Sequence, residues 1–159
     1  MNNSELINEN LIELNVHAQT KNEALKKVAN IVFNAGRVEN GDNYLNGMLD
    51  RETISTTGFG GGVAIPHAKV DGVFEPTISV IKLKQAVEWD AMDDKPVQLL
   101  IALAIPRKQE GTVHLKLLAK LSENLMEEDF VDSLKSANTK KKILNTITSI
   151  FKYKGEIQS

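Results

Sequence analysis

The segment that most constrains the fold is PVQLLIALAIP, residues 96–106, an almost continuous apolar run that begins and ends with a proline. A helix that crosses a bilayer needs about 20 apolar residues, so this run is too short to span a membrane. At this length, and with a proline at each end, it is typical of a strand that is buried on both faces. We therefore predict a central strand of a sheet here.

The rest of the chain alternates strand-like and helix-like segments. Further strands are predicted at 11–16, 62–66 and 76–84. Helices are predicted in five places: from the capping box Thr20/Glu23 to Gly36, from the turn Asn40-Gly41-Asp42 to about Arg51 and Glu52, from Thr112 to Leu125, over 127–137, and from the cap Asn138 to Phe151. The segment 84–96, which holds the only tryptophan, Trp89, is predicted to be a loop or a hairpin. Alternating strands and helices favour a layered α/β architecture.

Length and composition exclude several classes of protein. The 159 residues fit one domain, and 42% apolar with 25% charged residues is ordinary for a globular chain. A net charge of −2 provides no surplus of positive charge for a nucleic acid, and there are no cysteines for disulfides or thiolate chemistry. The first ten residues lack a secretory signal pattern. We expect a cytoplasmic protein without direct membrane insertion.

The segment TTGFGGGVAIPHAK, residues 56–69, places four glycines shortly before His67. A dinucleotide fingerprint needs G-x-G-x-x-G, and although Gly58 and Gly60 match, the third position is Val63. Neither a P-loop Gly-Lys-Ser/Thr ending nor a G-x-S-x-G elbow occurs in the chain. Successive glycine amides can point into one concavity, which suits an anion.

His67 follows this loop and is predicted to be the reactive group. An imidazole with an ordinary pKa of about 6.5 is a nucleophile near neutral pH, and it can accept a phosphoryl group without a separate base. Arg51, upstream at a predicted helix end, can fold back to meet the phosphate with its planar fork. His114 lies in the first turn of a predicted helix, a favourable place for an anion. His17 has no such setting.

These segments resemble the enzyme IIA domain of the bacterial sugar phosphotransferase system, fructose/mannitol type. The likeness runs from about residue 10 to 150 and rests on four segments: MLDRETISTTG (48–58), TTGFGGGVAIPHAK (56–69), AVEWDAMDDKPVQLLIALAIP (86–106, with Ala86 where a proline is frequent) and GTVHLKLLAKLSENLMEEDFVDSL (111–134). The second of these resembles the family's active-site signature, and the others support it in the expected order.

The resemblance implies a single α/β domain over residues 1–159, with its core at about 10–150 and a mixed β-sheet flanked by helices on both faces. It also implies that His67 accepts a phosphoryl group from the carrier protein HPr and passes it to a cysteine of enzyme IIB. The membrane subunit IIC then takes part in uptake of the sugar. By the same match Arg51 and His114 assist at the phosphate, and no metal, nucleotide or other cofactor is used.

Three further residues are expected to support the phosphate: Thr57, Gly58 and Gly60. For the Thr57 hydroxyl, a contact with phosphate and a place in a turn both stay open. The glycines permit positive φ, which an anion pocket formed by backbone amides needs. Arg51 has a simpler alternative as well, because a cation is favourable at the C-terminal end of any helix.

Two alternative functions stay open. Some relatives of this type carry the same histidine signature and act as regulators, of the nitrogen type, by phosphorylation-dependent protein binding. A metal-dependent hydrolase would need His67, His114 and a carboxylate such as Asp71 or Glu110, but no H-E-x-x-H pairing is present. Among sugars, a fructose-like substrate is the first expectation, with mannitol and related hexitols open.

Overall fold

The computed structural model describes residues 6–108 and 112–151, with the backbone alone described at 112–114. A six-stranded sheet lies at its centre: β1 (Ile12–Val16), β2 (Gly58–Gly60), β3 (Val63–Ala64), β4 (His67–Val70), β5 (Thr77–Val87) and β6 (Val97–Pro106). Its order is β1-β5-β6-β3-β2, and β4 also pairs with β6. β6 is antiparallel to β5 and parallel to β3 and β4, so the sheet is mixed, as predicted.

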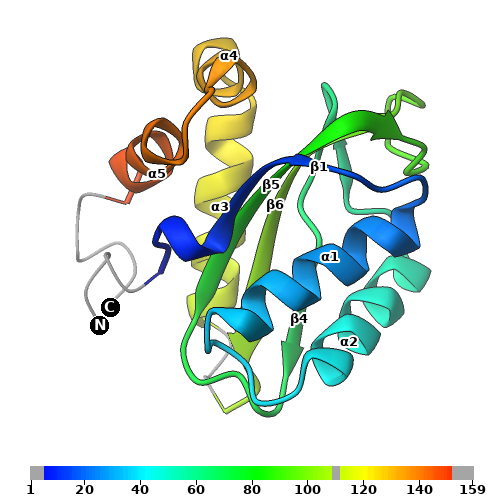
Figure 1. The fold of residues 1–159 in the computed structure, drawn as a ribbon, viewed down its shortest axis with the longest axis vertical. Coiled ribbons are helices and arrows are strands. Elements are labelled where there is room, and N and C mark those ends of the chain that lie inside the picture. The colour runs from blue at the N-terminus through cyan, green and yellow to red at the C-terminus, as the bar shows by residue number, and fades with distance from the viewer. Residues whose placement is uncertain (1–5, 109–111, 152–159) are drawn as a thin grey trace.

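Helices cover both faces of this sheet. A short 3₁₀ helix, η2 (Glu9–Leu11), precedes β1, and the α-helices are α1 (Lys21–Asn34), α2 (Gly41–Ile54), α3 (Thr112–Leu125), α4 (Glu128–Ser136) and α5 (Lys140–Ser149). Figure 1 shows α1 and α2 against one face and α3 against the other. Every residue of β6 except Gln98 is buried between these layers. The prediction of a central strand covered on both sides is therefore confirmed.

Local capping decides where three helices begin. Thr20 caps α1 as predicted, because its hydroxyl accepts the Glu23 N–H at 3.1 Å. Asn40 was predicted to be in a turn, but it is the N-cap of α2, whose residues include Gly41 and Asp42. The predicted cap Asn138 is wrong by one position: Thr139 has the extended backbone of a cap, and its hydroxyl accepts the first-turn N–H of Lys142 at 3.1 Å.

The chain breaks its strand just before His67. A single strand was predicted at 62–66, but the structure has β3 and β4 in succession along the same edge of β6. The ladder lapses between them because Ile65 donates its N–H to the Thr57 carbonyl at 3.0 Å, and Pro66 has no N–H to donate. The Pro66 carbonyl still accepts the Leu103 N–H at 2.9 Å. His67 therefore opens β4 directly after an irregular dipeptide.

The segment 84–96 forms the end of a hairpin, which was one of its two predicted conformations. β5 extends to Val87, the antiparallel β6 begins at Val97, and residues 88–96 connect them. Trp89 lies in this connection with only 1% of its surface exposed. The connection is therefore packed onto the domain by its largest side chain.

Helix α2 packs closely on β4. A Cβ atom at Gly47 would lie 2.6 Å from Cγ1 of Val70 and 2.9 Å from Cβ of Ala68, so a glycine is needed at this contact. Tyr44, one turn earlier, donates its buried hydroxyl to the Leu103 carbonyl at 2.9 Å. Arg51 is one turn after Gly47, on the same side of the helix. Close packing of α2 thus directs Arg51 toward the start of β4.

Candidate active site

His67 is the first residue of β4, and its side chain is largely buried, with 6% of the residue exposed. His67 was predicted only to follow the glycine loop; in the structure it pairs with Leu103 of β6 and belongs to the sheet. Its Nδ1 lies 2.8 Å from the Ile65 carbonyl oxygen. A carbonyl only accepts, so Nδ1 carries the proton. In the neutral ring the nucleophilic lone pair is then on Nε2.

Burial keeps this imidazole neutral. Desolvation is the main cause that lowers the pKa of His67 below its ordinary value, and the positive charge of Arg51 lowers it further. The hydrogen bond to Ile65 and the negative charge of Glu52 act in the opposite direction but are outweighed. The ring is therefore neutral, and hence nucleophilic, around pH 7.

We expect the His67 ring to titrate below the ordinary histidine pKa of about 6.5. Because the unfolded chain then binds the proton more readily, this residue's contribution to stability is complete above about pH 6.5 and declines as the pH falls. A ¹⁵N NMR titration of the ring nitrogens measures the pKa. Denaturant unfolding of the wild type and of His67→Gln at about pH 7 and pH 5 measures the linkage. A ring that titrates at or above the ordinary value would contradict the expectation.

Arg51 lies at the C-terminal end of α2, near His67. Its guanidinium donates to the Ser55 carbonyl at 2.8 Å and to the Ser55 hydroxyl at 3.4 Å. Ser55 ends the helix, so the arginine also satisfies a terminal carbonyl, as its simpler predicted role requires. Its positive charge lowers the pKa of His67, so the two residues lie within electrostatic reach of each other.

Glu52, whose negative charge acts on the His67 pKa, is a residue beside the candidate site that the sequence reasoning missed. Its side chain is 5% exposed, pairs with Lys21 Nζ at 2.9 Å, and accepts the Thr57 N–H at 3.1 Å. The Thr57 hydroxyl also donates to this carboxylate and accepts the Trp89 Nε1–H at 3.4 Å. The hydroxyl therefore has a structural role in this arrangement, and its contact with phosphate stays a prediction. The signal in the sequence that could have pointed to Glu52 was its position directly after Arg51.

The glycine turn lies away from His67. Gly60, Gly61 and Gly62 have φ values of +115°, +66° and +83°, and Gly61 donates its N–H to the Asp93 carboxylate at 2.9 Å. Val63, the next residue, is four ladder positions from His67 along β6, about 13 Å at the usual rise of a strand. The turn thus binds a carboxylate of the protein itself, that of Asp93. The structure does not bring Gly60 together with His67.

Gly58 lies on β2 against the connection between β5 and β6. A Cβ atom there would lie 2.6 Å from the Ala91 Cβ and 2.7 Å from its Cα. Since Ala91 is buried and the second atom belongs to the backbone, the clash has no easy relief. The structure explains this glycine by close packing, and its support of the phosphate stays a prediction.

The variant Gly58→Ala is expected to lower the free energy of unfolding by about 1–3 kcal/mol, the usual cost of overpacking. Denaturant titration followed by Trp89 fluorescence gives the value. Gly41→Ala is the matched control, because its added Cβ meets only ordinary contacts at 3.4 Å or more. If both variants unfolded at the same denaturant concentration, close packing against Ala91 would not explain why position 58 is a glycine.

His114 is the third residue of α3, in the first turn of the helix as predicted, and its side chain lies outside the described part. Glu110, a carboxylate of the alternative metal site, also falls outside the described residues. Asp71, the other one, lies 3.6 Å from Nε of Arg107. Among the described side chains, no group of three histidine or carboxylate residues is close enough to hold a metal ion.

Comparison with known proteins identifies the family. The profile of "Phosphoenolpyruvate-dependent sugar phosphotransferase system, EIIA 2" matches residues 5–150, so the chain belongs to this family. It is 37% identical over 140 residues to the "PTS system fructose-specific EIIA component" of Haloferax volcanii, covering 88% of this chain and 90% of that protein.

In the described part of the chain, no helix is long and apolar enough to cross a membrane.

Solved structures agree on the fold. The crystal structure of nitrogen regulatory protein IIA-Ntr from Neisseria meningitidis superposes with a TM-score of 0.83 at 25% identity, covering 90% of this chain and 97% of that one. The Escherichia coli enzyme IIAMTL, solved in complex with phosphorylated enzyme IIBMTL, gives a TM-score of 0.75 at 23% identity over 90% and 97% of the two chains. The fold class predicted from the sequence is confirmed.

Proposed function

We propose that this chain is a histidine phosphocarrier, which accepts a phosphoryl group from phospho-HPr on His67 and delivers it to a cysteine of enzyme IIB during sugar uptake. The observation that carries the proposal is the neutral ring beside Arg51, with Nδ1–H donated to the Ile65 carbonyl. This hydrogen bond leaves Nε2 as the nucleophilic atom. Membership of the family and the fructose-specific relative favour a fructose-like system.

The ring has what both steps of the transfer require. In the first, the Nε2 lone pair attacks the phosphorus of the donor phosphohistidine, a new N–P bond forms, and the donor imidazole leaves with the old bonding pair. Nδ1 keeps its proton, so the phosphorylated ring is cationic and donates more strongly to the Ile65 carbonyl. In the second, a thiolate attacks phosphorus and Nε2 recovers its electron pair, which restores the neutral ring. The Arg51 guanidinium meets the phosphoryl charge in both steps.

The test follows a labelled phosphoryl group through the relay. The wild-type protein is incubated with the first enzyme of the system, HPr and labelled phosphoenolpyruvate, and then with a fructose-type IIB. We expect the label on this chain first and on the IIB cysteine afterwards. No label on the chain would refute the phosphocarrier role.

The regulatory alternative rests on the likeness to nitrogen regulatory protein IIA-Ntr. It makes a different prediction in the same experiment, because a regulator accepts the label but passes it to no IIB. Testing IIB proteins of the fructose and mannitol types side by side decides between the two functions.

The variant His114→Ala is expected to accept the phosphoryl group but to pass it on to IIB about 100-fold more slowly, the lower end of what is usual when one donor to a reacting anion is removed. Rapid-quench measurement of the second transfer gives the rate. His17→Ala is the control, since His17 lies at a different place in the domain. Undiminished transfer from the His114 variant would remove this residue from the mechanism.

A further inference from the structure

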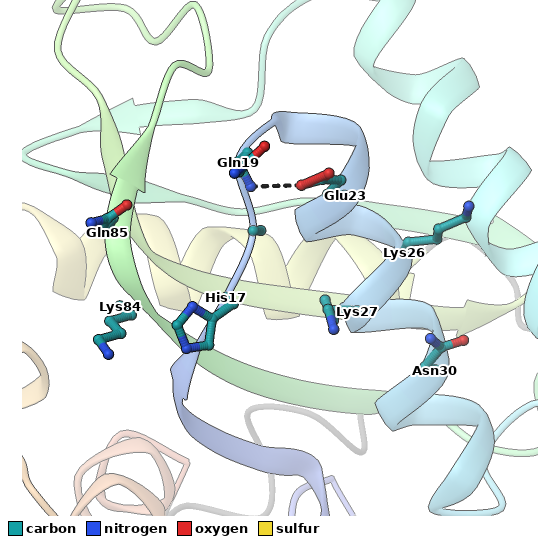
Figure 2. Close-up of a pocket in the computed structure, with 9 residues that line it drawn as sticks. His17, Gln19, Glu23, Lys26, Lys27, Asn30, Lys84 and Gln85 are labelled. Carbon is teal, nitrogen blue, oxygen red and sulfur yellow. Dashed lines mark hydrogen bonds between the residues drawn. The ribbon is translucent and has the colours of Figure 1, made fainter.

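A hollow on the surface lies where β5 runs past the end of β1. The two strands pair only as far as Val16 and Leu83, while β5 continues to Val87. Residues 17–20 lead from β1 into α1, so this connection, the first turns of α1 and the edge of β5 enclose a space of about 600 Å³ (Figure 2). The hollow is therefore a consequence of strands of unequal length.

The hollow is remote from His67. His67 pairs with Leu103, and Leu103 pairs with Ile78 of β5. Lys84, which lines the hollow, is six residues further along β5, about 20 Å at the usual rise of a strand. A ligand in this space would not contact the reacting ring.

Three lysines belong to the lining: Lys26 and Lys27 come from α1, and Lys84 comes from β5. His17 lines the hollow from the connection after β1. Figure 2 shows His17 lying between Lys84 and Lys27. Within the described part of the chain, none of these three lysines forms an ion pair, whereas Lys21 of the same helix is paired. In a chain whose net charge is −2, this is a local concentration of positive charge.

Apart from Ala18, the remaining lining residues are polar. Glu23 contributes the one carboxylate among the residues that enclose the hollow, and that carboxylate accepts the Gln19 N–H at 2.7 Å. The side-chain amides of Gln19, Asn30 and Gln85 line the same space and are suited to hydrogen bonds with hydroxyl groups. Its volume is within the range of sites for small molecules.

We propose that this hollow binds a small organic phosphate that carries more than one negative charge together with hydroxyl groups. The lysines bind the phosphoryl groups as compact positive charges, and the amides orient the hydroxyls. The concave shape and limited volume favour a small molecule over an acidic protein segment. The site is independent of the proposed phosphocarrier function, since its lining includes neither His67 nor Arg51.

The test uses the full-length, unphosphorylated protein without relay partners, so its outcome does not depend on phosphoryl transfer. Pyrophosphate and a hexose bisphosphate are titrated by calorimetry and by ¹H–¹⁵N NMR, with the unphosphorylated hexose as the neutral counterpart. We expect saturable binding at one site, with NMR shifts at residues 17–30 and 84–85, and tighter binding of the bisphosphate than of pyrophosphate. No saturable binding of either anion would overturn the proposal.

Two double variants separate a site from a general effect of charge. Lys27→Gln combined with Lys84→Gln is expected to weaken binding about tenfold, because two exposed charge interactions are lost. Lys141→Gln combined with Lys142→Gln removes the same charge from α5 and should leave the affinity within about twofold of the wild type. Equal weakening in both variants would overturn the proposal. Binding of polyglutamate at these residues without binding of either small anion would also overturn it, in favour of a protein surface.

Discussion

The variant His67→Ala is expected to take up no label from phosphoenolpyruvate through the first enzyme and HPr, whereas the wild type becomes fully labelled. The structure gives the reason: the hydrogen bond from Nδ1 to the Ile65 carbonyl leaves Nε2 with the lone pair, and burial keeps the ring neutral. Mass spectrometry of the intact protein, with the acid-labile phosphoryl group preserved, measures the uptake.

Two controls accompany this prediction. His17→Ala should be labelled like the wild type, because His17 lies in the hollow beside β5. His67→Gln keeps nearly the size of the buried ring and can still donate to the Ile65 carbonyl, so the protein should stay folded. We expect it to take up no label either, which would show that the loss in His67→Ala is not caused by misfolding. Labelling of His67→Ala at the wild-type level would transfer the role to another histidine.

The variant Arg51→Gln is expected to slow phosphoryl uptake about 100-fold and to raise the pKa of His67. The rate falls because the guanidinium no longer meets the charge of the transferring group, a loss comparable to removing one donor from an oxyanion site. The pKa rises because Arg51 lowers it in the wild type. Rapid-quench labelling gives the rate, and ¹⁵N NMR of the ring gives the pKa.

The two measurements on Arg51 separate its electrostatic role from its structural one. Arg107→Gln is the matched control, since this exposed arginine pairs with Asp71 at the far end of β4. It should leave both the rate and the pKa unchanged. If Arg51→Gln slowed uptake but left the His67 pKa in place, the arginine would act through the Ser55 contacts at the end of α2 instead.

Much of the fold could be predicted because its main signals are local. The run at 96–106 indicated the central strand β6, and each of the five predicted helical segments corresponds to an α-helix. Errors occurred where two local signals competed. Asn40 is favourable in a turn and as a helix cap, and Asn138 directly precedes a second residue of a favoured cap type, Thr139. The split into β3 and β4 depends on pairing with β6, which a single sequence does not reveal.

The sequence offered the chemical groups of the candidate site more readily than their surroundings. His67 and Arg51 carry recognisable chemistry, and the structure places them near each other. Glu52 was missed because its place depends on contacts that only the fold creates, such as the ion pair with Lys21, 31 residues away in the sequence. The glycine turn suggested an anion cradle, but Asp93, 32 residues away in the sequence, is the carboxylate bound to Gly61.

The tight contact of α2 with β4 also has a consequence for engineering. Gly47 touches no reacting atom, yet a single added methyl group there would meet Val70 and Ala68 and push the whole helix outward. The guanidinium at the helix end would then retreat from the imidazole. Anyone who transplants His67 and Arg51 to another scaffold must therefore carry the glycine along, because Gly47, one helical turn before Arg51, sets how closely the helix approaches the strand that His67 begins.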